Sequence, residues 1–149
     1  MNHTEETKLL EQIENWNDAD EYSRCIEAIE AIPEQERSYL LTVKLSRAYS
    51  NLAVLGDYKE HGTDCEVDGN LIQHAIAILE SVRVQGENDP YWNARMGYSC
   101  MMAYSSATTA YEYAKRWLAL APDDQAAKKL VHDCEMYIEE EKALKLNCK

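Results

Sequence analysis

The sequence predicts an all-α protein that forms one domain. Apolar residues recur three and four positions apart along most of the 149 residues, which is the spacing of one helical face. Only 3 prolines and 5 glycines interrupt the chain, and no stretch has the pattern of a strand. Hydrophobic residues make up 46% and charged residues 28%, a balance typical of a globular chain rather than a disordered one.

Four helices are expected in the first half of the chain. Thr4 is the predicted N-cap of the first helix, with two glutamates following in its first turn. The second helix is expected to stop at Pro33, and the fourth to end at Gly86. The apolar stripes of these four helices cover residues 9–16, 22–32, 41–52 and 71–82.

Three further helices are expected in the second half, over 90–104, over 108–120, and from Pro122 onward. Asp89 followed by Pro90 is the pattern of an N-cap and a first helical turn. Asp123 and Asp124 would lie in the first turn of the last helix, where the helix dipole favours negative charge. The connections are short everywhere except at residues 54–70.

The helices come in pairs, and the third pair has a recognisable set of residues. These are Trp92, Met96-Gly97, Ala110 and the closing Leu120-Ala121-Pro122. This set resembles the tetratricopeptide repeat (TPR) family, in which small residues such as Gly97 and Ala110 let two antiparallel helices approach at their crossing. Two features depart from the family pattern: Trp92 lies one residue early, and the large and small residues at positions 114 and 117 are exchanged.

Residues 41–53 resemble the first helix of such a repeat, with Leu45-Ser46 at the Leu-Gly pair, and residues 74–82 resemble the second, with Ala75 at the crossing. Residues 5–32 resemble a more degenerate pair. The resemblance implies a right-handed superhelical stack of antiparallel helix pairs, a solenoid of about three repeats plus a C-terminal capping helix. It implies a single TPR-like domain over 1–149, with an inserted loop at 54–70.

The insert contains several residues that could serve a site. Its second half begins like an EF-hand loop, with acidic residues and a glycine at Asp64, Glu66, Asp68 and Gly69. The closing glutamate of such a loop would fall at Ala75, which argues against calcium. His61 and Cys65 have the spacing of half a metal site, or of a nucleophile and base without an orienting third group. The favoured interpretation is therefore a solvated loop without cofactor or metal, with an extra turn on each flanking helix.

Composition limits the classes of partner. The net charge is −12 and no cluster of Lys and Arg occurs, so neither nucleic acid nor an anionic membrane surface is an expected partner. No apolar run approaches the length of a membrane span, and the first residues do not resemble a signal peptide. The five cysteines form no CxxC motif, which favours free thiols in a reducing cytoplasm.

The resemblance implies a non-catalytic module for protein–protein interaction, either an adaptor or an inhibitor of the immunity type found beside bacterial toxins. Its concave face would be built from the first helix of each pair. The predicted partner-binding residues are Val43, Arg47, Ser50, Asn51, Tyr91, Arg95, Tyr98, Met101 and Met102. Both arginines are expected to be exposed.

The clamp by which chaperone-binding TPR domains hold a carboxylate is not expected, because Val43, Arg47, Ala94 and Tyr98 stand where its Lys and Asn would lie. The expected partner is another protein or peptide, basic in character because the chain is acidic. The alternatives are a homo-oligomeric structural adaptor and an enzyme or metal site in residues 56–70.

Overall fold

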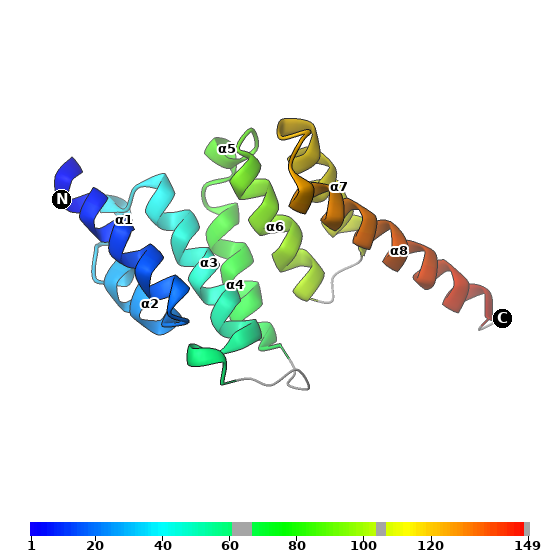
Figure 1. Cartoon of the computed structure of the whole chain (residues 1–149), viewed down its shortest axis with the longest axis horizontal. Helices are drawn as coiled ribbons and strands as arrows, with labels where there is room; N and C mark the ends of the chain where they lie inside the picture. The colour runs from blue at the N-terminus through cyan, green and yellow to red at the C-terminus, as the bar shows by residue number, and fades with distance from the viewer. Residues whose placement is uncertain (61–66, 104–106, 148–149) are drawn as a thin grey trace. The chain divides into compact units, whose positions relative to one another are not determined.

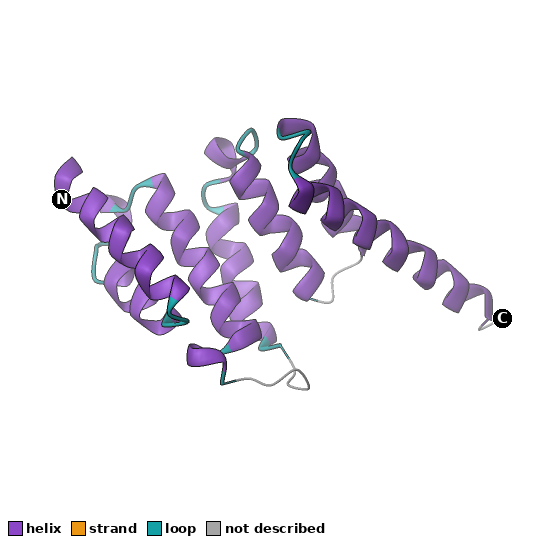
Figure 2. Cartoon of the chain, in the orientation of Figure 1, coloured by secondary structure: helices purple, strands orange, loops and turns teal. Residues whose placement is uncertain are grey.

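The computed structural model describes residues 1–60, 67–103 and 107–147, and divides the chain into two compact units, Met1–Val82 and Arg83–Lys149. Unit 1 contains α1 (His3–Asp18), α2 (Tyr22–Glu30), η1 (Glu34–Glu36), α3 (Tyr39–Leu55), η2 (Asp57–Lys59) and α4 (Gly69–Glu80) (Figure 1). Unit 2 contains α5 (Arg83–Gly86), α6 (Pro90–Met102), α7 (Ala107–Leu120) and α8 (Gln125–Asn147). No strand occurs in the described residues (Figure 2), which confirms the all-α prediction.

All seven expected helices are present, but the first begins earlier than predicted. Its N-cap is Asn2 rather than Thr4, since the Asn2 side chain accepts a hydrogen bond from the Glu5 backbone N–H at 2.9 Å. The Glu5 carboxylate accepts in return from the Asn2 backbone N–H at 3.0 Å. This reciprocal capping box satisfies two donors that a start at Thr4 would leave without partners.

The last helix begins three residues later than predicted. Pro122 lies in the preceding turn, and Asp124 caps α8 instead. The Asp124 carboxylate accepts hydrogen bonds from the backbone N–H groups of Ala126 at 2.9 Å and Ala127 at 3.3 Å. An aspartate is a stronger N-cap than the preceding Leu-Ala-Pro turn can offer, so the helix starts where the cap lies.

The fourth predicted helix is divided. α4 ends at Glu80, where the Val82 backbone N–H bonds the Leu79 carbonyl and the Ser81 hydroxyl bonds the Ile78 carbonyl at 2.6 Å. These i to i−3 bonds tighten the last turn and end the helix. The short helix α5 follows as part of unit 2, and Val84 within it is 90% exposed.

The core of unit 1 lies among α1, α2 and α3. Its buried residues are Ile13, Cys25, Ile26, Ile29, Leu41, Leu45 and Ala48. α4 packs on α3 through small residues, since the buried Ser46 hydroxyl donates to the Ala75 carbonyl at 2.8 Å. Only a short side chain allows the two backbones to approach so closely. Ser46 and Ala75 were both predicted to lie at a helix crossing for this reason.

Unit 2 has a corresponding crossing between α6 and α7. A Cβ atom at Gly97 would meet the Leu130 Cδ2 atom of α8 at 2.9 Å and the Ala110 carbonyl oxygen of α7 at 3.8 Å. Ala110 and Ala114 are fully buried, and Trp117 is 6% exposed, so the exchanged small and large residues both belong to the core. Gly97 and Ala110 therefore lie at the predicted crossing.

The buried Trp92 connects α5 to α6. A Cβ atom at Gly86 would overlap the Trp92 indole ring, so only glycine fits there. The adjacent Asn93 side chain is also buried, and its amide donates to the carbonyls of Glu87 at 3.1 Å and Asp89 at 3.0 Å. Together they hold the turn that leads into α6.

The inserted segment is shorter than predicted, because α3 continues to Leu55. The segment begins with a folded turn that packs on α2. Asp57 accepts from the Ser23 backbone N–H at 2.9 Å, and the Tyr58 hydroxyl donates to Glu21 at 2.7 Å. Tyr58 has a φ of 55°, a left-handed conformation that these bonds maintain. An extra turn after the preceding helix was expected, and η2 is such a turn, with Tyr58 and Lys59 exposed. The bonds of Asp57 and Tyr58 to Ser23 and Glu21 were not predicted, and deleting residues 57–59 would remove them.

We expect Gly86→Ala to lower the free energy of unfolding by about 1–3 kcal/mol, because the new methyl group displaces the buried Trp92 ring. Gly69→Ala is the matched control, since a Cβ atom at Gly69 has no neighbour within 4 Å in the described structure. Urea unfolding of both variants measures the difference. Equal stability of the two variants would contradict the close contact at Gly86.

Candidate functional site

The described residues offer no metal centre. Among residues 1–60, 67–103 and 107–147, no three His, Cys, Asp or Glu side chains are placed to share a metal ion. His61, Asp64, Cys65 and Glu66, which the sequence analysis considered, lie outside the described residues. In the same described ranges, no helix is long and apolar enough to cross a membrane.

The three described cysteines are part of the packed interior. Cys25, Cys100 and Cys134 are buried, and none of them is in a disulfide. Burial raises the pKa of the Cys25 and Cys134 thiols to about 11. At neutral pH they are therefore protonated and act as small apolar side chains.

The predicted binding residues on α3 do not form an open surface. Val43 and Ser50 are buried, at 0% and 5% exposure. The Asn51 side chain donates to the Asn17 side chain of α1 at 3.1 Å. The Arg47 side chain is only 11% exposed and Arg95 is half-buried, so the prediction that both arginines are exposed is wrong for Arg47 and met only in part for Arg95. Arg47 is covered because it pairs with a carboxylate on the neighbouring helix α1.

That carboxylate is Glu14 of α1. Arg47 contacts it with both terminal nitrogens, at 2.9 and 3.2 Å, and the Lys44 ammonium lies 2.8 Å from the same carboxylate. Burial alone would raise the pKa of the Glu14 carboxyl, but the hydrogen bonds and charges of Arg47 and Lys44 lower it below its ordinary value of 4.5. Arg47 thus connects α3 to α1 within unit 1.

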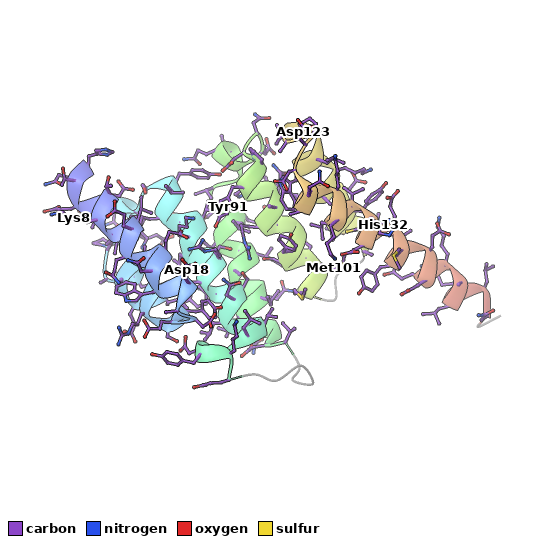
Figure 3. All side chains as sticks on the ribbon, viewed as in Figure 1. Lys8, Asp18, Tyr91, Met101, Asp123 and His132 are labelled. Carbon is purple, nitrogen blue, oxygen red and sulfur yellow. The ribbon has the colours of Figure 1, made fainter. Side chains whose placement is uncertain are left out.

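The predicted residues on α6 have a different environment. Tyr91, Arg95, Tyr98 and Met101 are half-buried, and Met102 is 37% exposed. Figure 3 shows Tyr91 near the beginning of α6 and Met101 near its end. Tyr91, Arg95, Tyr98 and Met102 follow one another at intervals of four, three and four, so they share one side of the helix.

The middle of this side is held by contacts of the Tyr98 ring with a guanidinium and with a second ring. The Arg95 guanidinium carbon lies 5.6 Å from the centroid of the Tyr98 ring. The Tyr98 ring in turn meets the Trp117 ring of α7 edge-on, with 5.7 Å between the centroids. Burial raises the pKa of the Tyr98 phenol despite the nearby Arg95 charge. Tyr98 is therefore fixed in place while part of its surface stays open to solvent.

α8 adds residues to this side that the sequence analysis missed. The charges of Lys129 and Asp133 act on the Tyr98 phenol, and Lys129 pairs with Asp133 at 2.7 Å. Met136 and Tyr137 follow about one turn further along α8. Tyr137 and its neighbour Met136 are each 50% exposed. We call this surface the α6–α8 face. It consists of Tyr91, Arg95, Tyr98 and Met102 of α6 and Lys129, Asp133, Met136 and Tyr137 of α8.

One sequence signal could have found the α8 residues. The buried residues Ala127, Leu130 and Cys134 form one stripe of α8, and Tyr137 continues this stripe three positions further, where it is 50% exposed. An apolar stripe that continues past the buried part of a helix is the signal, because its apolar side is then open to a partner. Comparisons with family models, curated proteins and solved structures found no match to this chain.

The Glu14 pair predicts a pH dependence of stability. Because the folded-state pKa of Glu14 lies below 4.5, its contribution is complete above pH 4.5 and is lost as the pH falls through the lowered value. We expect the difference in melting temperature between wild type and Glu14→Gln to be constant above about pH 5.5 and to shrink towards pH 3. Thermal unfolding followed by circular dichroism measures it. A difference that does not change with pH would contradict a charged pair.

Proposed function

We propose that this chain is a TPR-like module that recognises another protein through the α6–α8 face and carries out no chemistry itself. The observation that carries the proposal is the set of ring contacts among Arg95, Tyr98 and Trp117, which holds a partly open Tyr98. The exposed Met102 lies on the same side of α6, and the exposed Met136 and Tyr137 lie further along α8. Tyr, Met and Arg are the residue types enriched in the centres of protein interfaces.

The physical advantage of this surface is that its central side chains are already ordered. A tyrosine fixed by ring contacts loses little conformational freedom on binding, so more of its contact energy appears as affinity. Met102 and Met136 differ in this respect, because an unbranched thioether side chain adapts to the shape of its partner. A fixed centre with adaptable neighbours suits a protein surface better than it suits a small substrate.

The TPR-like part of the proposal is supported by the two helix crossings. In unit 1, Ser46 and Ala75 bring α3 and α4 together, and in unit 2 Gly97 and Ala110 bring α6 and α7 together. Each pair stands where the TPR resemblance expects small residues. The proposal includes the superhelical stack of helix pairs. It also includes a location in a reducing cytoplasm, which is supported by the three described cysteines, none of which is in a disulfide.

The charge distribution supports a basic partner. Residues 1–82 contain 17 acidic and 6 basic residues, a net charge of −11, whereas residues 83–149 contain 10 and 9, a net charge of −1. Unit 1 therefore supplies nearly all of the long-range attraction for a basic protein. The contact itself would be made by the nearly neutral unit 2, and an adaptor or an inhibitor of a basic protein fits this division.

A homo-oligomeric adaptor is the second candidate, and one observation favours it. Residues 139–147 of α8 are all exposed, among them Leu144 at 65% and Leu146 at 71%. Sedimentation velocity over a hundredfold range of concentration distinguishes the two functions. A monomer throughout that range would exclude the second candidate.

The recognition surface can be tested by site-specific photo-crosslinking. A photoreactive phenylalanine analogue replaces Tyr137 in one protein and Tyr58 in another, because both tyrosines are exposed but only Tyr137 belongs to the α6–α8 face. We expect the Tyr137 probe, incubated with an extract of the cells that express the chain, to label one protein that the Tyr58 probe does not label. Mass spectrometry identifies the labelled protein.

Binding measurements with the purified partner complete the test. Tyr137→Ala is expected to weaken the affinity about tenfold or more, as for an interface residue near the centre. Val84→Ala is the control, because Val84 is 90% exposed and lies outside the α6–α8 face. Unchanged affinity for Tyr137→Ala, or equal labelling by the two probes, would contradict the proposed surface.

A further inference from the structure

Unit 2 has a second polar surface, on α5 and α7. A cavity of about 320 Å³ is lined by Arg83, Thr108, Thr109, Glu112, Tyr113 and Arg116. A neighbouring cavity of about 350 Å³ shares Arg116 and is also lined by Glu87, Asn88, Ala119 and Leu120. None of these residues belongs to the α6–α8 face. Arg83 and Arg116, which line these cavities, both lie near the Tyr113 ring.

Arg83 is held firmly in this surface. One of its terminal nitrogens donates to the Tyr113 hydroxyl at 2.6 Å. Its guanidinium carbon lies 5.1 Å from the centroid of the buried Trp92 ring and 5.7 Å from that of Tyr113. Contacts with two rings and a hydroxyl fix both the position and the plane of the guanidinium.

Arg116 is less constrained. It is exposed, and its guanidinium carbon lies 6.0 Å from the Tyr113 ring centroid. Within the described residues, Arg116 forms no ion pair with a carboxylate. The one acidic residue in the 320 Å³ cavity, Glu112, instead pairs with Lys115 at 3.1 Å. The cavity thus has positive charge available for a ligand.

We propose that this cavity binds a carboxylate of an acidic segment of another protein. Arg116 would contact the carboxylate with both terminal nitrogens, since its planar fork matches the two oxygens. Arg83 adds a second, fixed positive charge, and the exposed Thr109 adds a hydroxyl that can donate a hydrogen bond. Leu120, 40% exposed in the neighbouring cavity, would contact an apolar residue of the same segment.

Charge favours a carboxylate over a phosphate at this place. The charged residues that line the 320 Å³ cavity are Arg83, Arg116 and Glu112, a net charge of +1, which one carboxylate neutralises and a phosphate dianion would exceed. Unit 2 as a whole is close to neutral, with 10 acidic and 9 basic residues. Because charges more than about 10 Å away are largely screened at physiological salt, the nearby Arg83 and Arg116 decide whether an acidic segment binds there. This inference uses other residues than the proposed recognition of a basic partner, so either one can fail without the other.

The test is an NMR titration of the ¹⁵N-labelled full chain with a blocked tetrapeptide that contains two glutamates and a leucine. We expect saturable shifts at Thr108, Thr109, Tyr113 and the Arg116 Nε–H group, and weaker binding at high salt. Arg116→Gln should raise the Kd about tenfold or more, since it removes the charged fork. Lys128→Gln, an exposed charge on α8, is the matched control and should leave the Kd unchanged.

Three results would overturn the proposal. The first is the absence of saturable shifts up to millimolar peptide, and the second is an equal Kd for Arg116→Gln and Lys128→Gln. The third is tighter binding of inorganic phosphate, or of the same peptide with glutamine in place of glutamate. The first would exclude the site, the second would exclude the role of Arg116, and the third would exclude the carboxylate.

Discussion

The close approach of α6 and α7 at Gly97 decides how the rest of unit 2 is arranged. Gly97 lies against the Ala110 carbonyl on one side and the Leu130 side chain of α8 on the other, so three helices meet at a residue without a side chain. This contact turns Met96, Gly97 and Cys100 inward. Because a helix has 3.6 residues per turn, the same rotation leaves Arg95, Tyr98 and Met102 on the side away from the crossing. The proposed recognition surface is thus a consequence of packing at one glycine.

Unit 1 uses the same kind of crossing, but the open side of its helix is covered. Ser46 of α3 bonds the Ala75 carbonyl of α4, as a small residue at a crossing can. On another side of α3, Arg47 is paired with Glu14 of α1 and Asn51 with Asn17. The ion pair fixes α3 to α1, and it removes from solvent an arginine that a binding surface would need. This difference between the two helices is why the proposed contact lies in unit 2, while unit 1 contributes its charge of −11 through long-range attraction.

The helices were predictable because their signals are local. Apolar spacing and caps such as Asp89, which bonds the Tyr91 N–H at 3.0 Å, depend on residues a few positions apart. The burial of Arg47 was not predictable, because its partner Glu14 lies 33 residues away and a single sequence does not show which distant carboxylate meets which arginine. The contacts of Asp57 and Tyr58 with α2 could not be predicted for the same reason, since their partners also lie far away in the sequence. Of the candidate site, the α6 residues were proposed from the TPR resemblance, whereas Lys129, Tyr137 and the Arg83–Arg116 pair needed the arrangement of α5, α7 and α8.

The central claim, that the α6–α8 face is where a partner binds, is tested most directly by residue-resolved hydrogen exchange of the chain alone and in complex with its crosslinked partner. Amide exchange reports locally on burial and on helix opening, so an interface appears as slowed exchange in the helices that it covers. We expect slower exchange in residues 95–102 and 129–137 of the complex, with α2 and α4 unchanged. Slower exchange confined to α2 or α4, with α6 and α8 unaffected, would contradict it.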